Sequence, residues 1–387
     1  MSSGTRGYFD EMVRALTYLD WNAAAPLRPQ AVEAMSATLV RCGNPSSVHR
    51  WGRAARRAVE DGRAAVAALL DAPPEGIIFV SGGTEANHLA LLGAGRIRIL
   101  VSAVEHDSVL RAVPRAERIP VDRDGIVVLD ALDRLLAADP RPALVSVMLA
   151  NNETGVVQPV AEIARIARAY GALFHCDAAQ AAGKIPLDAG AIGADLVTLS
   201  AHKLGGPPGI GALVVKAALE LTPLLRGGGQ ERGRRAGTEN LVGIAGFAAA
   251  ASAAAAEIAV YDHIRALRDT LEAGVTVVAP ETVVLCASAP RLPNTVAVAM
   301  PGVAADTQVI ALDLEGVMVS AGAACASGKV GPSHVLQAMG IQSDLAASTI
   351  RVSLGWASSE ADIDQFLEAW AALYRRCRDL APGARAA

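Results

Sequence analysis

Lys203 lies where an apolar run ends and a glycine-rich turn begins. The run 195–199 predicts a buried strand, and residues 204–209 contain three glycines and two prolines. Desolvation at such a position lowers the pKa of a lysine, and an unprotonated amine is what imine formation with a carbonyl group requires. A solvent-exposed lysine at the end of a strand is the alternative interpretation, so the neighbouring motifs have to decide between the two.

A second apolar strand, 173–176, ends in Asp177, and Gln180 follows it. An aspartate at the end of a strand can pair with a pyridinium nitrogen, and pyridoxal phosphate is the cofactor that combines such a nitrogen with a lysine-bound carbonyl carbon. Lys203 and Asp177 together therefore predict a pyridoxal-phosphate site at two strand ends.

Five segments carry a resemblance to a known family. Residues 177–180 (Asp-Ala-Ala-Gln) and 200–203 (Ser-Ala-His-Lys) resemble the cofactor signature of the class V aminotransferase group among fold-type I pyridoxal-phosphate enzymes. Residues 43–49, 81–85 and 320–327 resemble cysteine desulfurases more narrowly. The resemblance implies that L-cysteine is converted to L-alanine while the sulfur passes to an enzyme cysteine as a persulfide, for iron–sulfur cluster assembly or another acceptor protein.

Short apolar runs alternate with amphipathic stretches through the first two thirds of the chain. This alternation predicts an α/β fold with a mainly parallel sheet, whose ligands bind at the carboxyl ends of the strands. The expected strands are 77–80, 97–101, 143–149, 173–176, 195–199 and 210–215, and the expected helices are 85–92, 107–113 and 159–170.

After about residue 261 the pattern changes to a mixture typical of a smaller α+β domain. We expect a large cofactor-binding domain at 18–260 and a small C-terminal domain at 261–387, and the resemblance implies that the N-terminal segment 1–17 joins the small one. The expected strands are 283–285, 295–299, 317–320 and 350–353, and the expected helices are 306–314 and 360–377.

Composition excludes several classes of protein. The 387 residues include 52% hydrophobic residues and carry a formal net charge of -4, which argues against disorder and against nucleic acid as a partner. Five scattered cysteines are typical of a reducing cytoplasm. The N-terminus lacks a secretory signal, and Met12 is an alternative start. The alanine-rich segment 241–260 predicts a buried helix rather than a membrane span, so we expect a soluble protein.

Two segments are candidates for binding the cofactor phosphate. Gly83 and Thr84 lie between a predicted strand and helix, where backbone N–H groups and the helix dipole favour an anion; an ordinary N-cap at Thr84 is the alternative. The resemblance assigns Gly83, Thr84, Ser200 and His202 to the phosphate. Thr238 ends a loop rich in glycine and arginine. In the family this loop reaches the phosphate of the neighbouring subunit, which implies a homodimer.

Three further residues are candidates for contacting the cofactor ring or the substrate. His106 follows a predicted strand, where it is either a capping residue or a group that stacks on the ring and moves protons. Asn152 is either a turn former or a donor to the cofactor and the substrate. Arg351 offers a rigid fork for a carboxylate, or else is salt-bridged in its strand. The resemblance places His106 over the ring, assigns Gln180 to the cofactor site, and places Arg351 at the substrate carboxylate.

Cys325 lies between small residues and glycines, which suits a thiolate that has to move between substrate and acceptor. From the sequence alone, a buried inert cysteine fits equally well. By resemblance Cys325 takes the sulfur and Lys203 moves the Cα proton, and no metal site is predicted. The alternatives are a related class V enzyme, either a selenocysteine lyase or an aminotransferase, or a non-catalytic sulfur-carrier scaffold.

Overall fold

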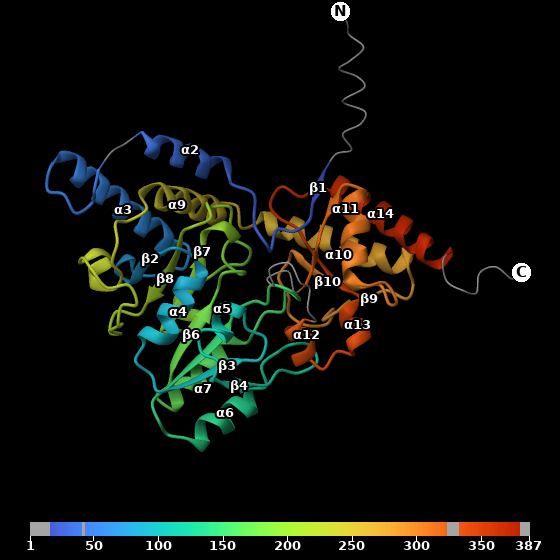
Figure 1. The fold of residues 1–387 in the computed structure, drawn as a ribbon, viewed down its shortest axis with the longest axis horizontal. Helices are drawn as coiled ribbons and strands as arrows, with labels where there is room; N and C mark the ends of the chain where they lie inside the picture. Colours follow the sequence, from blue (N-terminus) through green and yellow to red (C-terminus); the bar gives the residue numbers. More distant parts are fainter. Residues whose placement is uncertain (1–15, 41–42, 323–332, 380–387) are drawn as a thin grey trace, which may run out of the picture.

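The computed structural model describes residues 16–40, 43–322 and 333–379. Figure 1 shows two halves, a larger one built around a broad sheet and a smaller one that contains the C-terminal helices. The two halves meet along the carboxyl edge of the large sheet, and this junction positions the site described below.

The large half contains a seven-stranded sheet in which the five strands β7, β6, β5, β3 and β4 run parallel. Only β8 runs antiparallel to its neighbours β7 and β2 within this sheet. In spatial order the strands are β2 (Ile77–Val80), β8 (Gly211–Val215), β7 (Leu196–Ser200), β6 (Leu173–Asp177), β5 (Ala143–Met148), β3 (Arg98–Ser102) and β4 (Glu117–Ile119). The predicted α/β fold with a mainly parallel sheet is confirmed.

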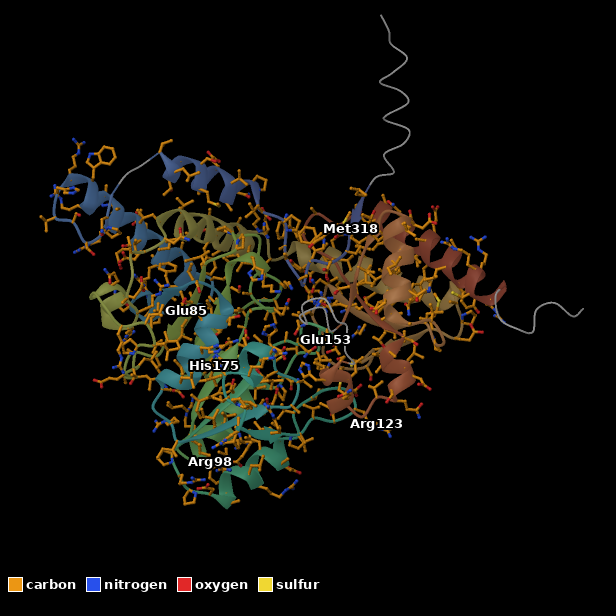
Figure 2. The ribbon with its side chains drawn as sticks, viewed as in Figure 1. Glu85, Arg98, Arg123, Glu153, His175 and Met318 are labelled. Carbon is orange, nitrogen blue, oxygen red and sulfur yellow. The ribbon has the colours of Figure 1, made fainter. Side chains whose placement is uncertain are left out.

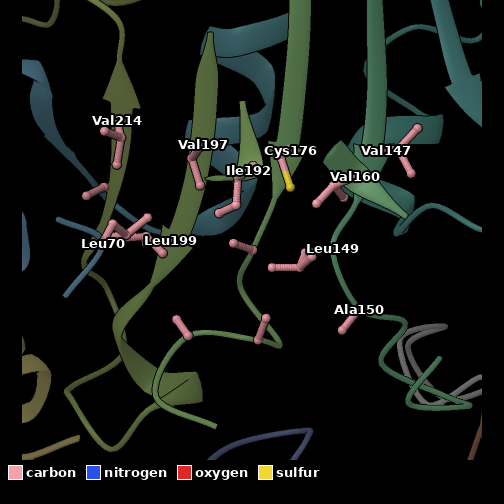
Figure 3. Packing of buried hydrophobic residues seen from close by; sticks show 14 of the residues in the cluster. Leu70, Val147, Leu149, Ala150, Val160, Cys176, Ile192, Val197, Leu199 and Val214 are labelled. Carbon is pink, nitrogen blue, oxygen red and sulfur yellow. The ribbon is translucent and has the colours of Figure 1, made fainter. Parts of the chain in front are cut away.

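Helices cover both faces of this sheet because its strands carry apolar side chains on both faces. Ile78 and Val80 pack with α4, whereas Val147, Cys176 and Val197 point into the opposite layer (Figure 3). The α-helices are α2 (Pro29–Leu39), α3 (Arg50–Ala68), α4 (Gly83–Gly93), α5 (Asp107–Leu110), α6 (Leu129–Ala138), α7 (Val160–Ala169), α8 (Ala189–Ile192) and α9 (Leu241–Ala256). Short 3₁₀ turns are η1 (Pro74–Gly76), η2 (Ala201–Lys203) and η3 (Gln230–Gly233).

The small half contains a four-stranded antiparallel sheet covered by long helices. Its strands, in spatial order, are β12 (Ser320–Ala321), β13 (Thr349–Ser353), β10 (Thr295–Ala299) and β9 (Val283–Leu285). Its helices are α10 (Val260–Val278), α11 (Ala305–Leu314), α12 (His334–Ala338), α13 (Ser343–Ala347) and α14 (Glu360–Asp379). The N-terminal strand β1 (Thr17–Tyr18) pairs in parallel with β11 (Val317–Met318), so the chain enters the fold beside this half.

The observed elements follow most of the predicted ones closely. The strand predicted at 317–320 is divided into β11 and β12, which belong to different sheets, and β1 and β4 were not predicted. The helix predicted at 107–113 ends at Leu110, and Pro114 accounts for part of this because it disfavours helical geometry at residue 113. The alanine-rich α9 is a buried helix as predicted, with Phe247, Ala250 and Ala251 in the core. Among the described residues, no single helix is long and apolar enough to span a membrane; α9 and α10 qualify only as a pair bent by 76°.

Candidate active site

A cavity of about 340 Å³ lies at the carboxyl edge of the large sheet, facing the small half. Ten of the twelve predicted site residues line it. They are Gly83, Thr84, His106, Asn152, Asp177, Gln180, Ser200, His202, Lys203 and Arg351.

Sheet topology explains why residues so far apart in sequence meet here. Lys203, Asp177, Asn152 and His106 follow or end four strands that are neighbours in the sheet, namely β7, β6, β5 and β3. Since parallel strands present their carboxyl ends at one edge, the four side chains converge on one cavity.

Asp177 lies at the base of the cavity and is 7% exposed. Its Oδ2 accepts a hydrogen bond from Asn87 Nδ2 at 2.8 Å, and its Oδ1 accepts one from the Ala179 N–H at 3.0 Å. Asn87 Nδ2 also donates to Ser108 Oγ at 2.8 Å. Both oxygens of the Asp177 side chain therefore accept hydrogen bonds, which fixes the orientation of the carboxyl group in the cavity.

The Lys203 amine is held by backbone oxygens of the N-terminal segment. Nζ donates to the carbonyl of Asn22 at 2.6 Å and to that of Ala23 at 2.9 Å. Beside it, His202 Nδ1 lies 2.9 Å from Ser200 Oγ. Burial, together with the charges of Lys203 and His106, lowers the pKa of His202 to about 4, so this imidazole is neutral at pH 7.

His106 is the capping residue of α5, which was one of the two interpretations of the sequence, and it also lines the cavity. Its ring caps α5, since Nδ1 accepts the Ser108 N–H at 3.1 Å, and the same ring lines the cavity. Because Nδ1 accepts from a backbone donor, the proton of the neutral ring is assigned to Nε2.

The start of α4 forms another side of the cavity. The N-cap is Gly82 and the helix begins at Gly83, so Thr84 lies in the first turn and the N-cap alternative for Thr84 is wrong. The backbone is tightly packed here, because a Cβ at Gly211 of β8 would lie 2.8 Å from the carbonyl carbon of Gly82. Only glycine at position 211 allows this approach.

Arg351 reaches the cavity from β13 of the small half and is 3% exposed. One terminal nitrogen pairs with Asp20 Oδ1 at 2.6 Å, and the other donates to the Asn152 carbonyl at 3.1 Å. Its Nε is buried without a hydrogen-bond partner in the described part of the chain. Arg351 therefore forms a salt bridge, as one interpretation of the sequence held, and it also lines the cavity.

Two predicted residues are not among the lining residues. Thr238 is exposed and does not line the cavity of this chain. Cys325 lies in the segment 323–332, outside the described residues. The residues on either side of that segment both meet Glu153, which Figure 2 places between the two halves. Ser333 Oγ donates to Glu153 Oε2 at 2.6 Å, and a Cβ at Gly322 would lie 2.8 Å from the same oxygen.

Sequence reasoning missed several residues at this site. Asn22, Ala23, Asn87 and Ser108 also line the cavity, and Lys184 is buried behind it. A helical signal was available for Asn87, because it lies four residues after Gly83 and therefore on the same helix face. For Asn22 no local pattern exists, because its position depends on how the N-terminal segment crosses the sheet edge.

A second carboxyl group is fully buried next to His106. Glu105 Oε1 accepts hydrogen bonds from Ser102 Oγ at 2.5 Å and from the Met148 N–H at 2.7 Å, while Oε2 has no partner within the described residues. Burial, reinforced by the charge of Asp177, raises the pKa of Glu105 to about 8 against the lowering effect of its hydrogen bonds. This carboxyl group is therefore largely protonated at neutral pH.

Comparison with known proteins agrees with this geometry. The family model described as aminotransferase class V matches residues 17–366. A cysteine desulfurase of Cereibacter sphaeroides is 44% identical over 94% of this chain and 97% of its own length. The crystal structure of a NifS-like protein from Rickettsia africae superposes with a TM-score of 0.87 at 36% identity, over 93% of this chain and 99% of the other. A structure titled SspA in complex with cysteine has a TM-score of 0.75 at 29% identity, covering 87% of this chain and 98% of that one.

The chain therefore belongs to the aminotransferase class V family. Its relatives at this identity and coverage are cysteine desulfurases, and it belongs to that group within the family. The resemblance seen in its motifs is confirmed.

Proposed function

We propose that the protein is a pyridoxal-phosphate-dependent cysteine desulfurase, which converts L-cysteine to L-alanine and transfers the sulfur to its own Cys325. The observation that carries the proposal is the convergence of an amine, a carboxyl group and a guanidinium, from Lys203, Asp177 and Arg351, on one cavity of about 340 Å³. Membership of the cysteine desulfurase group supports the choice of substrate and product.

The cavity residues fit pyridoxal phosphate. Asp177 is an acceptor-rich carboxylate at the cavity base, and Asn87 Oδ1 beside it is buried without a partner in the described chain. The cofactor would be held by Gly83, Thr84, His106, Asn152, Asp177, Gln180, Ser200, His202 and Lys203, with Thr238 supplied by a second subunit. Once bound, it supplies an electron sink for bond cleavage at the substrate Cα and Cβ.

Residues of the chain itself would bind the substrate and move its protons. Arg351, held in place by Asp20 and the Asn152 carbonyl, would bind the substrate carboxylate together with Asn152. Lys203 would move the Cα proton, because its amine lies in the cavity on two neutral carbonyl acceptors. His106 would exchange a proton with the substrate thiol through the ring nitrogen that does not cap α5.

Cys325 would be the nucleophile that takes the sulfur. Support comes from the residues that flank its segment, because Gly322 and Ser333 both lie against Glu153, the residue after Asn152 of the cavity. The segment that carries Cys325 therefore leaves and rejoins the described chain next to the site. Thiolate attack on the substrate sulfur would form the S–S bond of a persulfide on Cys325 while the substrate Cβ–S bond breaks. The electron pair of the broken bond would stay with the carbon fragment, which takes up a proton to become alanine, and the outer sulfur would be passed to a cluster-assembly protein or another acceptor.

A homodimer would complete the site. Leu39, Val48 and Trp51 expose 68%, 86% and 56% of their surface around α2 and α3. A groove of about 350 Å³ lined partly by Trp51 and Leu241 lies among them. Apolar exposure of this kind marks an interaction surface, and Thr238 lies exposed in a loop that a second copy would need for the phosphate.

We also infer the domain boundaries and the location of the protein. The large domain would comprise residues 18–260 and the small one 261–387, with residues 1–17 joined to the small domain; residues 1–15 and 380–387 lie outside the described residues. Parallel pairing of β1 with β11 supports this. The described cysteines Cys176, Cys286 and Cys377 are free, which is typical of the cytoplasm.

Borohydride reduction tests the cofactor assignment. The purified protein loaded with pyridoxal phosphate should be yellow, and reduction followed by peptide mapping should place the label on Lys203. Addition of L-cysteine should release alanine, and Lys203→Ala should abolish both the label and the alanine. A label on another lysine, or accumulation of an α-keto acid in place of alanine, would contradict the proposal.

A further inference from the structure

A second lysine amine is buried beneath the site, and the chemistry proposed above does not use it. Lys184 is 3% exposed, and its Nζ donates to Asn22 Oδ1 at 2.7 Å and to Gln180 Oε1 at 2.8 Å. Both acceptors are neutral amide oxygens. Burying an ammonium group against neutral acceptors is costly, so its retention calls for a reason other than stability.

Asn22 connects Lys184 to the reactive part of the cavity. Its backbone carbonyl accepts hydrogen bonds from Lys203 Nζ at 2.6 Å and from Gln180 Nε2 at 2.8 Å. Its side-chain Nδ2 donates to Thr295 Oγ1 of the small half at 2.8 Å and to the Asn152 carbonyl at 3.2 Å. A displacement of Asn22 would therefore change the hydrogen bonds of both Lys203 and Asn152.

Lys184 contributes to the orientation of two amides, and at Asn22 it acts together with Asn294, whose Nδ2 donates to the same Oδ1 at 3.2 Å. An ammonium group has three donors and no acceptor, so it requires the oxygen of each amide that it contacts. With Gln180 Oε1 turned to Lys184, Nε2 is directed to the Asn22 carbonyl. With Asn22 Oδ1 turned to Lys184, Nδ2 is directed to Asn152 and Thr295.

The electrostatic relation between the two amines is mutual. Burial is the largest of the effects that lower the pKa of Lys184 well below its usual value, and the charges of Lys203 and Arg351 add to it. These two are the charged groups that act on Lys184, one from η2 and the other from β13. By reciprocity, a proton on Lys184 disfavours a proton on Lys203.

We propose that Lys184 is a positioning residue for the cofactor-binding lysine: it locks the orientation of Asn22 and Gln180, and it keeps a second basic group behind the Lys203 amine. This inference rests on the proposed function, because it assigns Lys203 to the cofactor. It follows that a proton held by Lys184 disfavours protonation of Lys203, whose unprotonated amine is the form that attachment of the cofactor carbonyl requires.

The test uses the full-length protein loaded with pyridoxal phosphate and without substrate. Two variants separate charge from orientation. Lys184→Met removes the charge and both hydrogen bonds, whereas Lys184→Gln removes the charge but keeps an amide donor for the two oxygens. Lys216→Met is the control, because Lys216 is 58% exposed, pairs with Asp195 at 3.4 Å and does not line the cavity.

The primary readout is the pH midpoint of the visible absorption change of the loaded protein. Because a proton on Lys184 disfavours a proton on Lys203, removal of the Lys184 amine should raise this midpoint in both Lys184 variants, and the control should match the wild type. Equilibrium dialysis with pyridoxal phosphate should show weaker binding for Lys184→Met than for Lys184→Gln, because only the latter can hold the amides.

Unchanged midpoints in Lys184→Gln, together with wild-type affinity for pyridoxal phosphate, would overturn the inference. If Lys184→Met does not fold, the midpoint of Lys184→Gln decides alone. A wild-type protein that attaches no pyridoxal phosphate to Lys203 would instead refute the proposed function, so the two failures are distinguishable.

Discussion

Replacement of Arg351 by lysine tests how the site recognises a carboxylate. Arg351 is buried, and its two terminal nitrogens are directed by Asp20 at 2.6 Å and by the Asn152 carbonyl at 3.1 Å. These contacts hold the guanidinium plane in one orientation at the cavity wall. A lysine keeps the charge but loses the planar fork, so it cannot contact Asp20, the carbonyl and a substrate carboxylate in the same geometry.

The size of the effect follows from the hydrogen bonds that are lost. A hydrogen bond to a charged group is worth about 1.5–3 kcal/mol, and about 1.4 kcal/mol corresponds to a factor of ten. Loss of one such contact to the substrate should reduce kcat/KM for L-cysteine by roughly 10- to 150-fold. The visible spectrum of the loaded protein should stay unchanged, because Arg351 is not assigned to the cofactor.

Arg291→Lys provides a matched control. Arg291 has the same side-chain exposure as Arg351, 4%, and pairs with Glu272 at the same distance, 2.6 Å, but it does not line the cavity. Steady-state alanine release by the two variants is compared over a range of L-cysteine concentrations. Equal losses in both variants, or no loss in Arg351→Lys, would show that Arg351 has a structural role only.

Two further predictions concern stability. The pKa of Glu105 is near 4.5 in the unfolded chain and about 8 in the folded protein. Between these two pH values the folded protein holds a proton that the unfolded chain has lost, so the free energy of unfolding falls as pH rises. Urea midpoints at pH 5 and pH 8 should therefore differ less in Glu105→Gln than in the wild type, and an unaltered difference would exclude a raised pKa. Glu231→Gln weakens the buried ion pair with Arg63, whose charged groups lie 2.8 Å apart, and should lower the free energy of unfolding by about 3 kcal/mol. Glu281→Gln, which weakens an exposed ion pair with Arg378, should leave the urea midpoint unchanged.

Much of the fold was predictable because its strands are buried on both faces. The bounds of β2, β9 and β10 match the predicted ranges, and β3, β5, β6, β7, β8 and β13 differ from theirs by one residue at an end or at both ends. The strand predicted at 317–320 is instead two strands, β11 and β12, and β1 and β4 were not predicted. Continuous apolar runs bounded by turn residues give a strong signal for such strands. The short α5 was less predictable, because four helical residues leave almost no periodicity.

The cavity was predictable where a strand end supplied a residue and unpredictable where tertiary structure did. Lys203, Asp177 and Asn152 each follow an apolar run, so the parallel topology brings them together. Asn22 and Lys184 meet only because tertiary structure brings the N-terminal segment into contact with the turn after β6. That contact joins residues 162 positions apart, and no local pattern encodes it.

The most direct test of the account is the location of the transferred sulfur. The loaded protein is exposed briefly to L-cysteine, digested without reductant and analysed by mass spectrometry. One added sulfur should appear on the peptide that contains Cys325. Cys325→Ala should still bind the cofactor but lose release of alanine, whereas Cys286→Ala should keep it. Sulfur on a different cysteine, or alanine release at the wild-type rate by Cys325→Ala, would contradict the proposed mechanism.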